Sequence, residues 1–333
     1  MKKTTHDFAT LLQSFFMDRL VKQRNASPHT IKSYRDTFRL LLRFTQEHLQ
    51  KAPSNLNFVE IDAPLVARFL ETLEEDRNVC ARSRNLRLTA IRSFFRYAAL
   101  EMPTHSAQIQ RVLAIPGKRH ERPLVQFLTQ PEIKALLAAP DQKTRSGRRD
   151  HALILVAVHT GLRLSELIAL RRQNVALDTG AHVRVTGKGR KERCTPLTKQ
   201  TVTVLKAWMD ELGGDSNQPL FPGARGKQLS ADGVQYILSK HSAVAGRSCP
   251  SLAQKRVTPH TLRHTMAMEL LLAGVDRAMI ALWLGHESVE TTQIYLHANL
   301  VLKEQLLAKT SLPQGTPGLY RPDDNLLAFL TSL

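Results

Sequence analysis

The chain has 333 residues, 42% of them hydrophobic, so it is long enough for two domains and too apolar to be disordered throughout. Lys and Arg number 47 against 29 Asp and Glu, and the excess is shared, since residues 1–123 and residues 124–333 each carry nine more basic than acidic residues. This distribution excludes a single basic tail and favours two domains that face one polyanion; a basic protein without such a partner is the alternative.

The three cysteines, Cys80, Cys194 and Cys249, are far apart and form no C-x-x-C pair. This spacing argues against a disulfide framework or a cysteine zinc site and is typical of a reducing cytoplasm. No apolar stretch approaches the roughly 18 residues that a membrane helix needs, and no signal-peptide core follows Lys2 and Lys3. We therefore expect a cytoplasmic protein without membrane spans.

The first hundred residues show apolar positions at helical spacing in four segments. The first covers residues 7–24, and the second begins at Pro28 behind Ser27, a pair typical of a helix N-terminus. A third segment begins at Pro64, and the fourth covers residues 81–100. The sequence thus predicts a helical N-terminal domain.

The segment 81–100 combines an apolar stripe with an excess of arginine. The stripe, which we expect to be buried, consists of Leu86, Ala90, Ile91, Phe94, Phe95 and Ala98. The other faces carry no acidic residue and five arginines: Arg82, Arg84, Arg87, Arg92 and Arg96. Solubility alone does not require so many cations, so we predict that they lie along the phosphate backbone of double-stranded DNA; a solvated basic face is the alternative.

The helical pattern breaks between Glu101 and Pro123, a stretch with several prolines and a basic run. We interpret this break as an interdomain linker. The predicted organisation is a helical domain at 1–115, a linker at 116–127, a second domain at 128–312 and a C-terminal tail at 313–333.

The second domain is predicted to be mainly helical with a small β-hairpin or sheet. The segment 150–158 is almost wholly apolar, so we expect a central helix there. Strand character at 182–185 and 192–195 on either side of Gly187-Lys188-Gly189-Arg190 predicts the hairpin. Other helices are predicted to begin near 129 and 163, and to cover 198–211, 231–244, 260–273, 276–284, 290–298 and, in the tail, 324–330.

Arg163 follows Thr160-Gly161-Leu162 at the end of the predicted central helix. A guanidinium at that point can present a rigid fork to phosphate oxygens. The alternative is an ion pair with Glu166, three residues further along the chain.

His260, Arg263 and His264 stand at helical offsets of 0, 3 and 4, so they share one face of a helix that begins after Pro259. The N-terminus of a helix also favours an anion. A zinc site is the alternative, because two histidines four residues apart can bind this metal, but the glutamate of an H-E-x-x-H motif is missing and no cysteine adjoins the pair. We expect no metal and no other cofactor.

Lys188 is predicted at the tip of the hairpin, near Arg190, Lys191 and Arg193. A lysine there could reach an anion, and an exposed turn lysine is the alternative. Some of these four cations are expected to be merely electrostatic.

Tyr295 stands nine residues after His286 in Leu284-Gly285-His286. A phenol, with a pKa of ~10, becomes a competent nucleophile when nearby cations stabilise the phenolate and the transition state. Because the phenolate leaves readily from an aryl phosphate ester, attack on a phosphodiester would be reversible without ATP. A tyrosine packed in the core is the alternative.

Taken in order, these motifs resemble those of the tyrosine recombinase (phage integrase) family, especially its Xer-like and transposon-encoded members. The resemblance covers most of the chain. It implies a helical core-binding (SAM-like) domain followed by a catalytic domain of the DNA breaking-rejoining fold. It also implies site-specific cleavage and rejoining of DNA, without metal or ATP, in the service of a mobile element or of DNA resolution.

The resemblance also implies roles for six residues. Arg163 and Arg263 would bind the scissile phosphate, and Lys188 would protonate the departing 5′-oxygen. His260 would assist proton transfer and His286 would hydrogen-bond a non-bridging oxygen. Tyr295 would attack and form a 3′-phosphotyrosyl link.

The implied assembly is a homo-tetramer on two paired DNA sites, with C-terminal helices exchanged between neighbours and a partner recombinase as a further option. Three other functions are weighed against it: a type IB topoisomerase-like enzyme, a DNA-binding regulator without catalysis, and a metallohydrolase. The target DNA sequence, and the choice between integration, excision, resolution and transposition, cannot be read from the chain.

Overall fold

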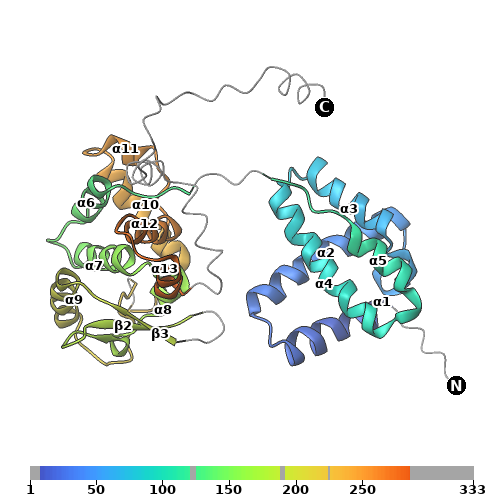
Figure 1. Cartoon of the computed structure of the whole chain (residues 1–333), viewed down its shortest axis with the longest axis horizontal. Helices are drawn as coiled ribbons and strands as arrows, with labels where there is room; N and C mark the ends of the chain where they lie inside the picture. Colours follow the sequence, from blue (N-terminus) through green and yellow to red (C-terminus); the bar gives the residue numbers. More distant parts are fainter. Residues whose placement is uncertain (1–7, 121–124, 188–191, 224–225, 286–333) are drawn as a thin grey trace, which may run out of the picture. The chain divides into compact units, whose positions relative to one another are not determined.

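The computed structural model describes residues 8–120, 125–187, 192–223 and 226–285. The chain folds into two compact units, Met1–Arg122 and Pro123–Leu333 (Figure 1). The mainly helical fold with one small sheet confirms the predicted fold class. The helices predicted at 290–298 and 324–330 lie outside the described residues, and no described helix is long and apolar enough to cross a membrane.

The first unit is built around five α-helices. Serine and aspartate caps begin two of them, because Ser27 Oγ accepts a hydrogen bond from the backbone N–H of Thr30 and Asp62 Oδ1 accepts one from that of Leu65. The elements are α1 (Phe8–Ser14), the π-helix η1 (Phe15–Gln23), α2 (Pro28–Leu49), η2 (Pro53–Asn55), η3 (Phe58–Glu60), α3 (Ala63–Glu75), α4 (Ala81–Glu101), η4 (Pro103–His105) and α5 (Ser106–Ala114).

Aromatic side chains hold this unit together. The ring of Phe15 meets those of Phe94 and Phe38 edge-on, with centroids 5.5 and 6.2 Å apart, and Phe8 packs on Phe94 in the same way. Such edge-to-face pairs add about 0.5–1.5 kcal/mol each to the gain from burial. The core therefore ties η1, α2 and α4 together.

Two expectations for this unit are wrong. Leu86, placed on the buried stripe of α4, is 61% exposed, whereas Leu88 is buried and takes its place. The segment interpreted as a pattern break contains α5, which buries Ile109 and Val112. The short length of α5 left too few apolar positions to reveal its periodicity.

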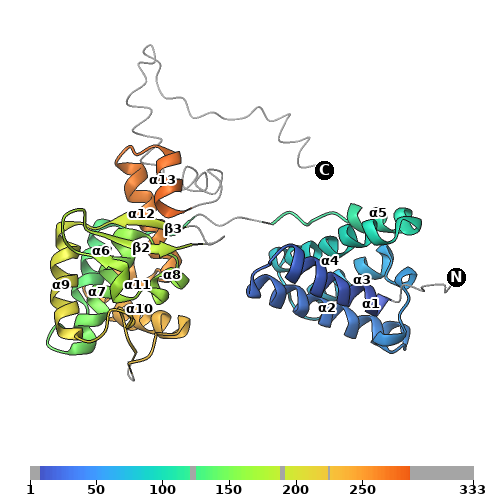
Figure 2. The same cartoon turned by 90° about the horizontal axis from the view of Figure 1, so that it is seen from below.

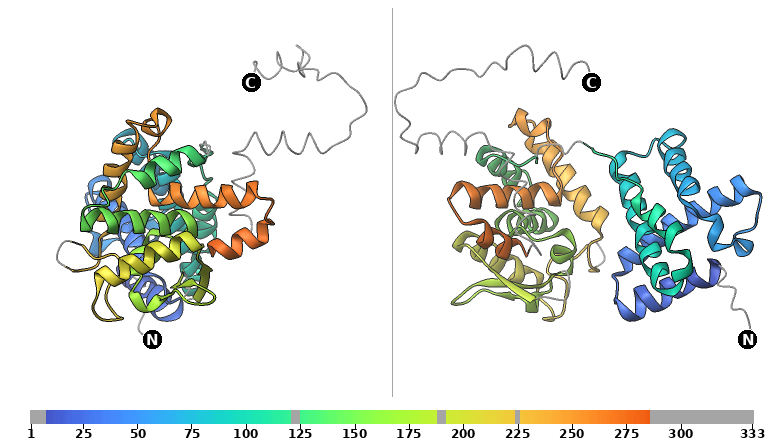
Figure 3. Two further views of the ribbon diagram at one scale, coloured as in Figure 1. Left: turned by 90° about the vertical axis from the view of Figure 1, so that its left-hand side faces the viewer. Right: turned by 45° about the vertical axis from the view of Figure 1, so that its right-hand side comes forward.

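The second unit is organised around α7, whose residues Ala152–Val158 are all buried. Helices α6, α9 and α12 pack against α7, and α13 packs against α12 (Figure 3). The central helix was thus predicted correctly. The helices are α6 (Gln130–Ala138), α7 (Arg145–Thr160), α8 (Leu164–Ala169), η5 (Arg172–Asn174), α9 (Lys199–Leu212), α10 (Ala231–Ala245), α11 (Pro250–Ala253), α12 (Pro259–Leu272) and α13 (Arg277–Leu284).

The sheet is antiparallel with the order β1-β2-β3, formed by Val175–Ala176, His182–Thr186 and Glu192–Pro196. The predicted hairpin is confirmed, and Val185 stands opposite Arg193 in its register. In Figure 2 the strands β2 and β3 pass beside α8. The strand β1 was not predicted, because two residues carry no measurable alternation.

Two glycines bring the ends of α7 and α13 together. Gly161 ends α7 with φ of +62°, and a Cβ there would lie 2.8 Å from Cδ2 of Leu284. Gly285 ends α13 with φ of +65°. Since only glycine adopts this conformation without strain, both helices stop where the following residues can meet.

Candidate active site

The structure describes three of the six residues predicted to act on a phosphate: Arg163, His260 and Arg263. Lys188, His286 and Tyr295 lie outside the described residues. The residues that precede two of them are described, since Lys188 follows Gly187 at the end of β2 and His286 follows Gly285.

Arg163 occupies the N-cap position of α8 and is about one-quarter exposed. Its Nη1 donates to Oε1 of Glu166 at 3.0 Å, so the ion pair considered as an alternative is present. Its Nη2 also donates to the carbonyl oxygen of Gly285 at 2.5 Å. Arg163 is therefore held by a carboxylate on one side and by the end of α13 on the other.

Arg263 lies on α12 and is only 4% exposed. Its Nη1 donates to the carbonyl oxygen of Gly161 and its Nη2 to that of Leu284, both at 2.7 Å. The guanidinium thus joins the ends of α7 and α13. Because both contacts are with neutral carbonyls, the positive charge is not cancelled by them.

These contacts bring the two arginines into one site. Arg163 and Arg263 bind the carbonyls of Gly285 and Leu284, which are adjacent in the chain. The Cα atoms of consecutive residues are about 3.8 Å apart, so the two guanidiniums converge on one turn. Two fixed cations on one turn can share the oxygens of one phosphate and stabilise the charge that develops during attack on phosphorus.

Glu166 is a buried carboxylate shared between two arginines. Arg193 donates from Nη1 to Oε1 at 2.9 Å and from Nη2 to Oε2 at 2.8 Å, and Arg163 donates to the same two oxygens from Nη1 and from its backbone N–H. Burial alone would raise the pKa of Glu166, but the hydrogen bonds from Arg193 and from the backbone N–H of Arg163 lower it below its usual value. Glu166 therefore stays ionised and holds both arginines.

The two histidines of α12 differ in exposure. His260 is exposed in the first turn, and its ring stacks on that of His264 with centroids 6.2 Å apart. Burial, followed by the charges of His260 and Arg263, lowers the pKa of His264 to about 4. His264 is consequently neutral at physiological pH, which suits a side chain that orients its neighbour.

Four of the five arginines of α4 fall into two groups. Arg82 and Arg96 are exposed, and Arg87 is half-buried. Arg84 is 6% exposed and donates to the carbonyl oxygen of Pro116 at 2.9 Å, while half-buried Arg92 donates to that of Ile115. Arg84 and Arg92 thus bind the chain itself, and Arg82 and Arg96 face solvent. Arg190 and Lys191, also predicted to bind DNA, lie outside the described residues.

A second basic face lies on α2 and was missed in the sequence. It consists of exposed cations at positions i, i+3, i+7 and i+11, which share one side of the helix. Their spacing was the available signal, but acidic and aromatic residues between them hid it. The residues are Lys32, Arg35, Arg39 and Arg43.

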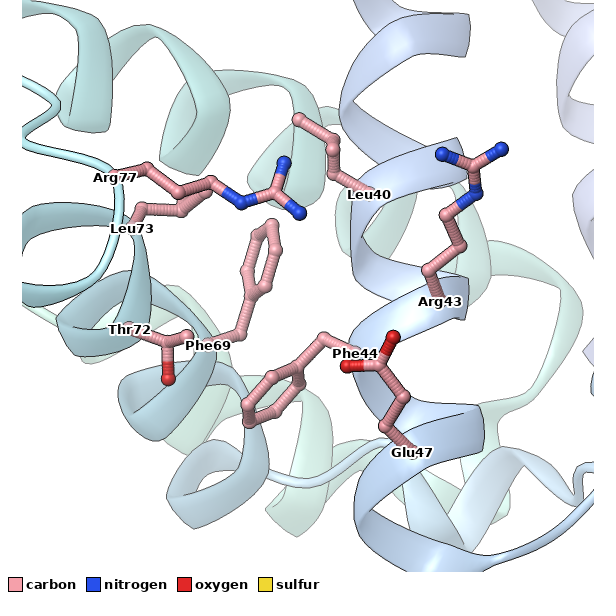
Figure 4. A pocket seen from close by; sticks show the side chains of 8 residues that line it. All are labelled: Leu40, Arg43, Phe44, Glu47, Phe69, Thr72, Leu73 and Arg77. Atoms are coloured by element: carbon pink, nitrogen blue, oxygen red, sulfur yellow. The ribbon is translucent and has the colours of Figure 1, made fainter.

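Beside this face, α2 and α3 enclose a hollow of about 40 Å³. Figure 4 shows Arg43 and Arg77 on opposite sides of it and Phe44 and Phe69 below. This volume admits about one water molecule. The hollow is therefore too small for a nucleotide, and its two arginines extend the basic surface.

In the part of the chain that the structure describes, no three His, Cys, Asp or Glu side chains gather as metal ligands do. The expectation that no metal takes part stays a prediction.

The chain matches known families over both units. Residues 126–300 match the phage integrase family, and residues 14–102 match the phage integrase N-terminal SAM-like domain. A protein of Sinorhizobium fredii (strain NBRC 101917 / NGR234) named "Putative integrase/recombinase y4rC" is 65% identical over 325 residues, which are 98% of each chain. The tyrosine recombinase XerD of Pseudomonas putida is 33% identical over 299 residues, covering 88% of this chain and 95% of the relative.

A solved structure shares the fold. The XerH site-specific recombinase, bound to a palindromic difH substrate in a post-cleavage complex, superposes with a TM-score of 0.70. The identity is 22%, and the match covers 86% of this chain and 81% of that one. Both units are therefore similar in sequence or fold to proteins that recombine DNA.

Proposed function

The chain belongs to the phage integrase family and is a tyrosine-type site-specific recombinase that cleaves and rejoins DNA, and we propose that Tyr295 is its nucleophile. The phenolic oxygen attacks the scissile phosphorus, the bond from phosphorus to the 5′-oxygen breaks, and a 3′-phosphotyrosyl link remains. The 5′-hydroxyl of a partner strand then attacks this link and releases the tyrosine. No metal or nucleotide is needed, because each step replaces one phosphate ester bond with another.

The observation that carries this proposal is the convergence of Arg163 and Arg263 on the carbonyls of Gly285 and Leu284. In the proposed site the two guanidiniums bind the non-bridging oxygens and stabilise the pentacoordinate transition state. The chain continues from this turn to His286, nine residues before Tyr295. A site at the end of α13 thus stands where a short further segment could deliver the phenol.

Proton transfer is assigned to the remaining residues. Lys188, between β2 and β3, gives a proton to the departing 5′-oxygen. His260, exposed at the start of α12, accepts the proton of the Tyr295 phenol directly or through water. His286 donates a hydrogen bond to a non-bridging oxygen.

We assign DNA binding to both units. Residues 1–115 form the core-binding domain, with the exposed arginines of α4 and the basic face of α2 along the phosphates. Residues 128–312 form the catalytic domain, and 116–127 connect the two. Arg190 and Lys191 are assigned to phosphates near the cleaved bond.

The proposed assembly is a homo-tetramer on two paired duplexes, in which residues 313–333 pass to a neighbouring subunit. Strand exchange requires four cleaved strands, and each subunit supplies one tyrosine. A cytoplasmic location follows from the DNA substrate and is proposed on that ground.

The experiment compares the wild type with Tyr295→Phe on DNA. A duplex selected by the full chain from a random library is nicked near the cleavage point, so that the short 5′-hydroxyl fragment is lost and the adduct accumulates. The wild type should give a covalent complex that survives denaturing electrophoresis. Tyr295→Phe should bind the same duplex with unchanged affinity and give none.

Each competing function has its own outcome. An adduct formed by Tyr295→Phe would remove that residue as the nucleophile, and loss of all activity in chelator would indicate a metallohydrolase. Relaxation of supercoiled plasmid without exchange between two duplexes would indicate a topoisomerase-like enzyme. Normal function of Tyr295→Phe without any cleavage by the wild type would indicate a regulator.

A further inference from the structure

Arg193, on β3, contacts both groups that hold Arg163. Its first contact is the carboxylate of Glu166, which it binds through two parallel hydrogen bonds of 2.9 and 2.8 Å. Such a bidentate pair fixes the plane of the carboxylate as well as its position. Because Arg163 binds the same Oε1 atom at 3.0 Å, the carboxylate transmits the position of Arg193 to Arg163.

The second contact of Arg193 is with Gly285, whose carbonyl oxygen accepts the other hydrogen bond of Arg163. A Cβ built on Gly285 would lie 2.9 Å from Nη1 of Arg193 and 3.1 Å from its Cζ. The guanidinium therefore packs directly against this residue. A larger side chain at position 285 would require this guanidinium to move, so the glycine allows the close approach of Arg193 to the end of α13.

The side chain of Arg193 is largely buried, unlike that of an arginine that serves only solubility. Its side chain is only 14% exposed, and its Nε is buried without a hydrogen-bond partner among the described residues. Leaving a buried N–H unpaired costs about 1–3 kcal/mol. An arginine that only paired with Glu166 could do so with its Nε exposed to water, and it would then avoid this cost.

We propose, on the basis of the function proposed above, that Arg193 is a positioning residue that sets the guanidinium of Arg163 against the scissile phosphate. It acts through Glu166 on one side of Arg163 and through Gly285 on the other. In this proposal Arg193 acts only through these two groups and makes no contact with the DNA. Its loss leaves Arg163 present but free to rotate away from the phosphate.

The test measures single-turnover adduct formation on two versions of the nicked duplex, using Arg193→Ala in the full chain. One version has the ordinary phosphodiester, and the other has a methylphosphonate at the scissile position, which lacks the negative charge that Arg163 stabilises. We expect Arg193→Ala to slow cleavage of the ordinary substrate by about 10²-fold, since misplacement of a reacting group by 1 Å costs that much. The difference from the wild type should largely vanish on the methylphosphonate, as it should for Arg163→Ala.

Arg184→Ala is the matched control. Arg184 is an exposed arginine on β2 of the same sheet, so its removal changes the net charge equally and leaves Glu166 untouched. It should cleave both substrates at the wild-type rate, and both variants should bind DNA as the wild type does. Arg193→Lys keeps a charge opposite Glu166 and should fold even if Arg193→Ala does not; it should show a smaller defect with the same substrate dependence.

Three results would overturn the inference. One is wild-type cleavage by Arg193→Ala or, where that variant does not fold, by Arg193→Lys. Another is an equal loss on both substrates, which would indicate a general structural role. The third is a defect confined to DNA affinity. Failure of the proposed function is a separate result, because the wild type would then form no adduct through Tyr295.

Discussion

The two units use arginine in different ways. In the first unit, Arg84 and Arg92 bind carbonyls of Pro116 and Ile115, while Arg82 and others of α4 face solvent. In the second unit, three arginines from α8, β3 and α12 meet at the end of α13. Arginine density is high in both regions, but of these two clusters only the one in the second unit has two arginines that share one buried carboxylate.

The difference lies in what the arginines share. In the first unit, Arg84 and Arg92 also bind neighbouring carbonyls, those of Pro116 and Ile115, but they share no carboxylate with each other among the described residues. In the second unit, Arg163 and Arg193 share the buried carboxylate of Glu166, and the loss of one releases a group that holds the other. Substitutions should therefore affect stability in the first unit and catalysis in the second.

The largest expected effect is that of Arg263→Lys. The guanidinium of Arg263 binds the carbonyls of Gly161 and Leu284 and has further N–H donors for a phosphate. The ammonium of a lysine lacks this planar set of donors and cannot make all of these contacts together. We expect cleavage of the nicked duplex to fall by about 10²–10³-fold, the cost of removing one donor that stabilises a developing charge. Single-turnover adduct formation measures this effect, with DNA affinity unchanged.

The control for this substitution is Arg111→Lys, which makes the same chemical change at an exposed position of α5. It should cleave at the wild-type rate. Equal rates for Arg263→Lys and the wild type would show that a point charge suffices, and the contrast between the two units would then be lost.

An intermediate effect is expected for Arg84→Ala, compared with Arg82→Ala. Arg84 is 6% exposed, and its removal loses the hydrogen bond to the carbonyl oxygen of Pro116. Because hydrogen bonds of charged groups contribute about 1.5–3 kcal/mol, the free energy of unfolding of the first unit should fall by about that amount. Arg82 is exposed, so Arg82→Ala should change stability by less than about 0.5 kcal/mol. It should instead reduce the slope of log affinity for DNA against log salt by about 0.9.

Urea unfolding followed by circular dichroism tests the stability of these variants, since this signal includes the helices of the first unit. Tryptophan fluorescence would not report on that unit, because Trp208 and Trp283 both belong to the second. The salt dependence of DNA binding tests the phosphate contact. If Arg84→Ala flattened the salt slope and left stability unchanged, the division of α4 into structural and solvent-facing arginines would be incorrect.

The fold was predictable where local chemistry and periodicity agree. Ser27 before Pro28 marks the start of α2, and buried Val183 and Val185 alternate with exposed residues along β2. Leu86 was wrongly predicted to be buried, because it stands four residues before Ala90 and this spacing also fits a helical stripe. Packing of α4 against its neighbours selected Leu88 instead, and such a choice depends on tertiary contacts.

The site was predictable only in part. Arg163 and Arg263 stand in short motifs whose residue types point to phosphate chemistry, and the structure brings them together. The role of Arg193 could not be predicted, because its carboxylate partner lies 27 residues earlier. Strand alternation does not reveal which carboxylate a side chain meets, since this depends on the packing of β3 beside α8.

The smallest expected effect concerns His264, which borders the arginine cluster of the second unit. Its pKa in the folded chain is about 4, below the usual value of 6.5, because of burial and the neighbouring charges of His260 and Arg263. The unfolded chain therefore binds more protons between pH 6.5 and about 4, so stability should fall as the pH is lowered through this window and be unaffected by this group above it. Solvent around the partly exposed ring screens the neighbouring charges, so the loss of stability should be smaller than the full shift in pKa implies.

Urea unfolding at pH 5 and pH 7.5 measures this loss, and His264→Gln should reduce the difference between the two. His182→Gln, on β2 and away from the arginines, is the control and should leave the difference unchanged. Arg263→Lys retains both His264 and a positive charge at position 263, so it should preserve part of the pH dependence. If His264→Gln and the wild type lose the same stability at pH 5, the cations of the second unit do not suppress protonation of this histidine, and their convergence would be weaker than the hydrogen bonds imply.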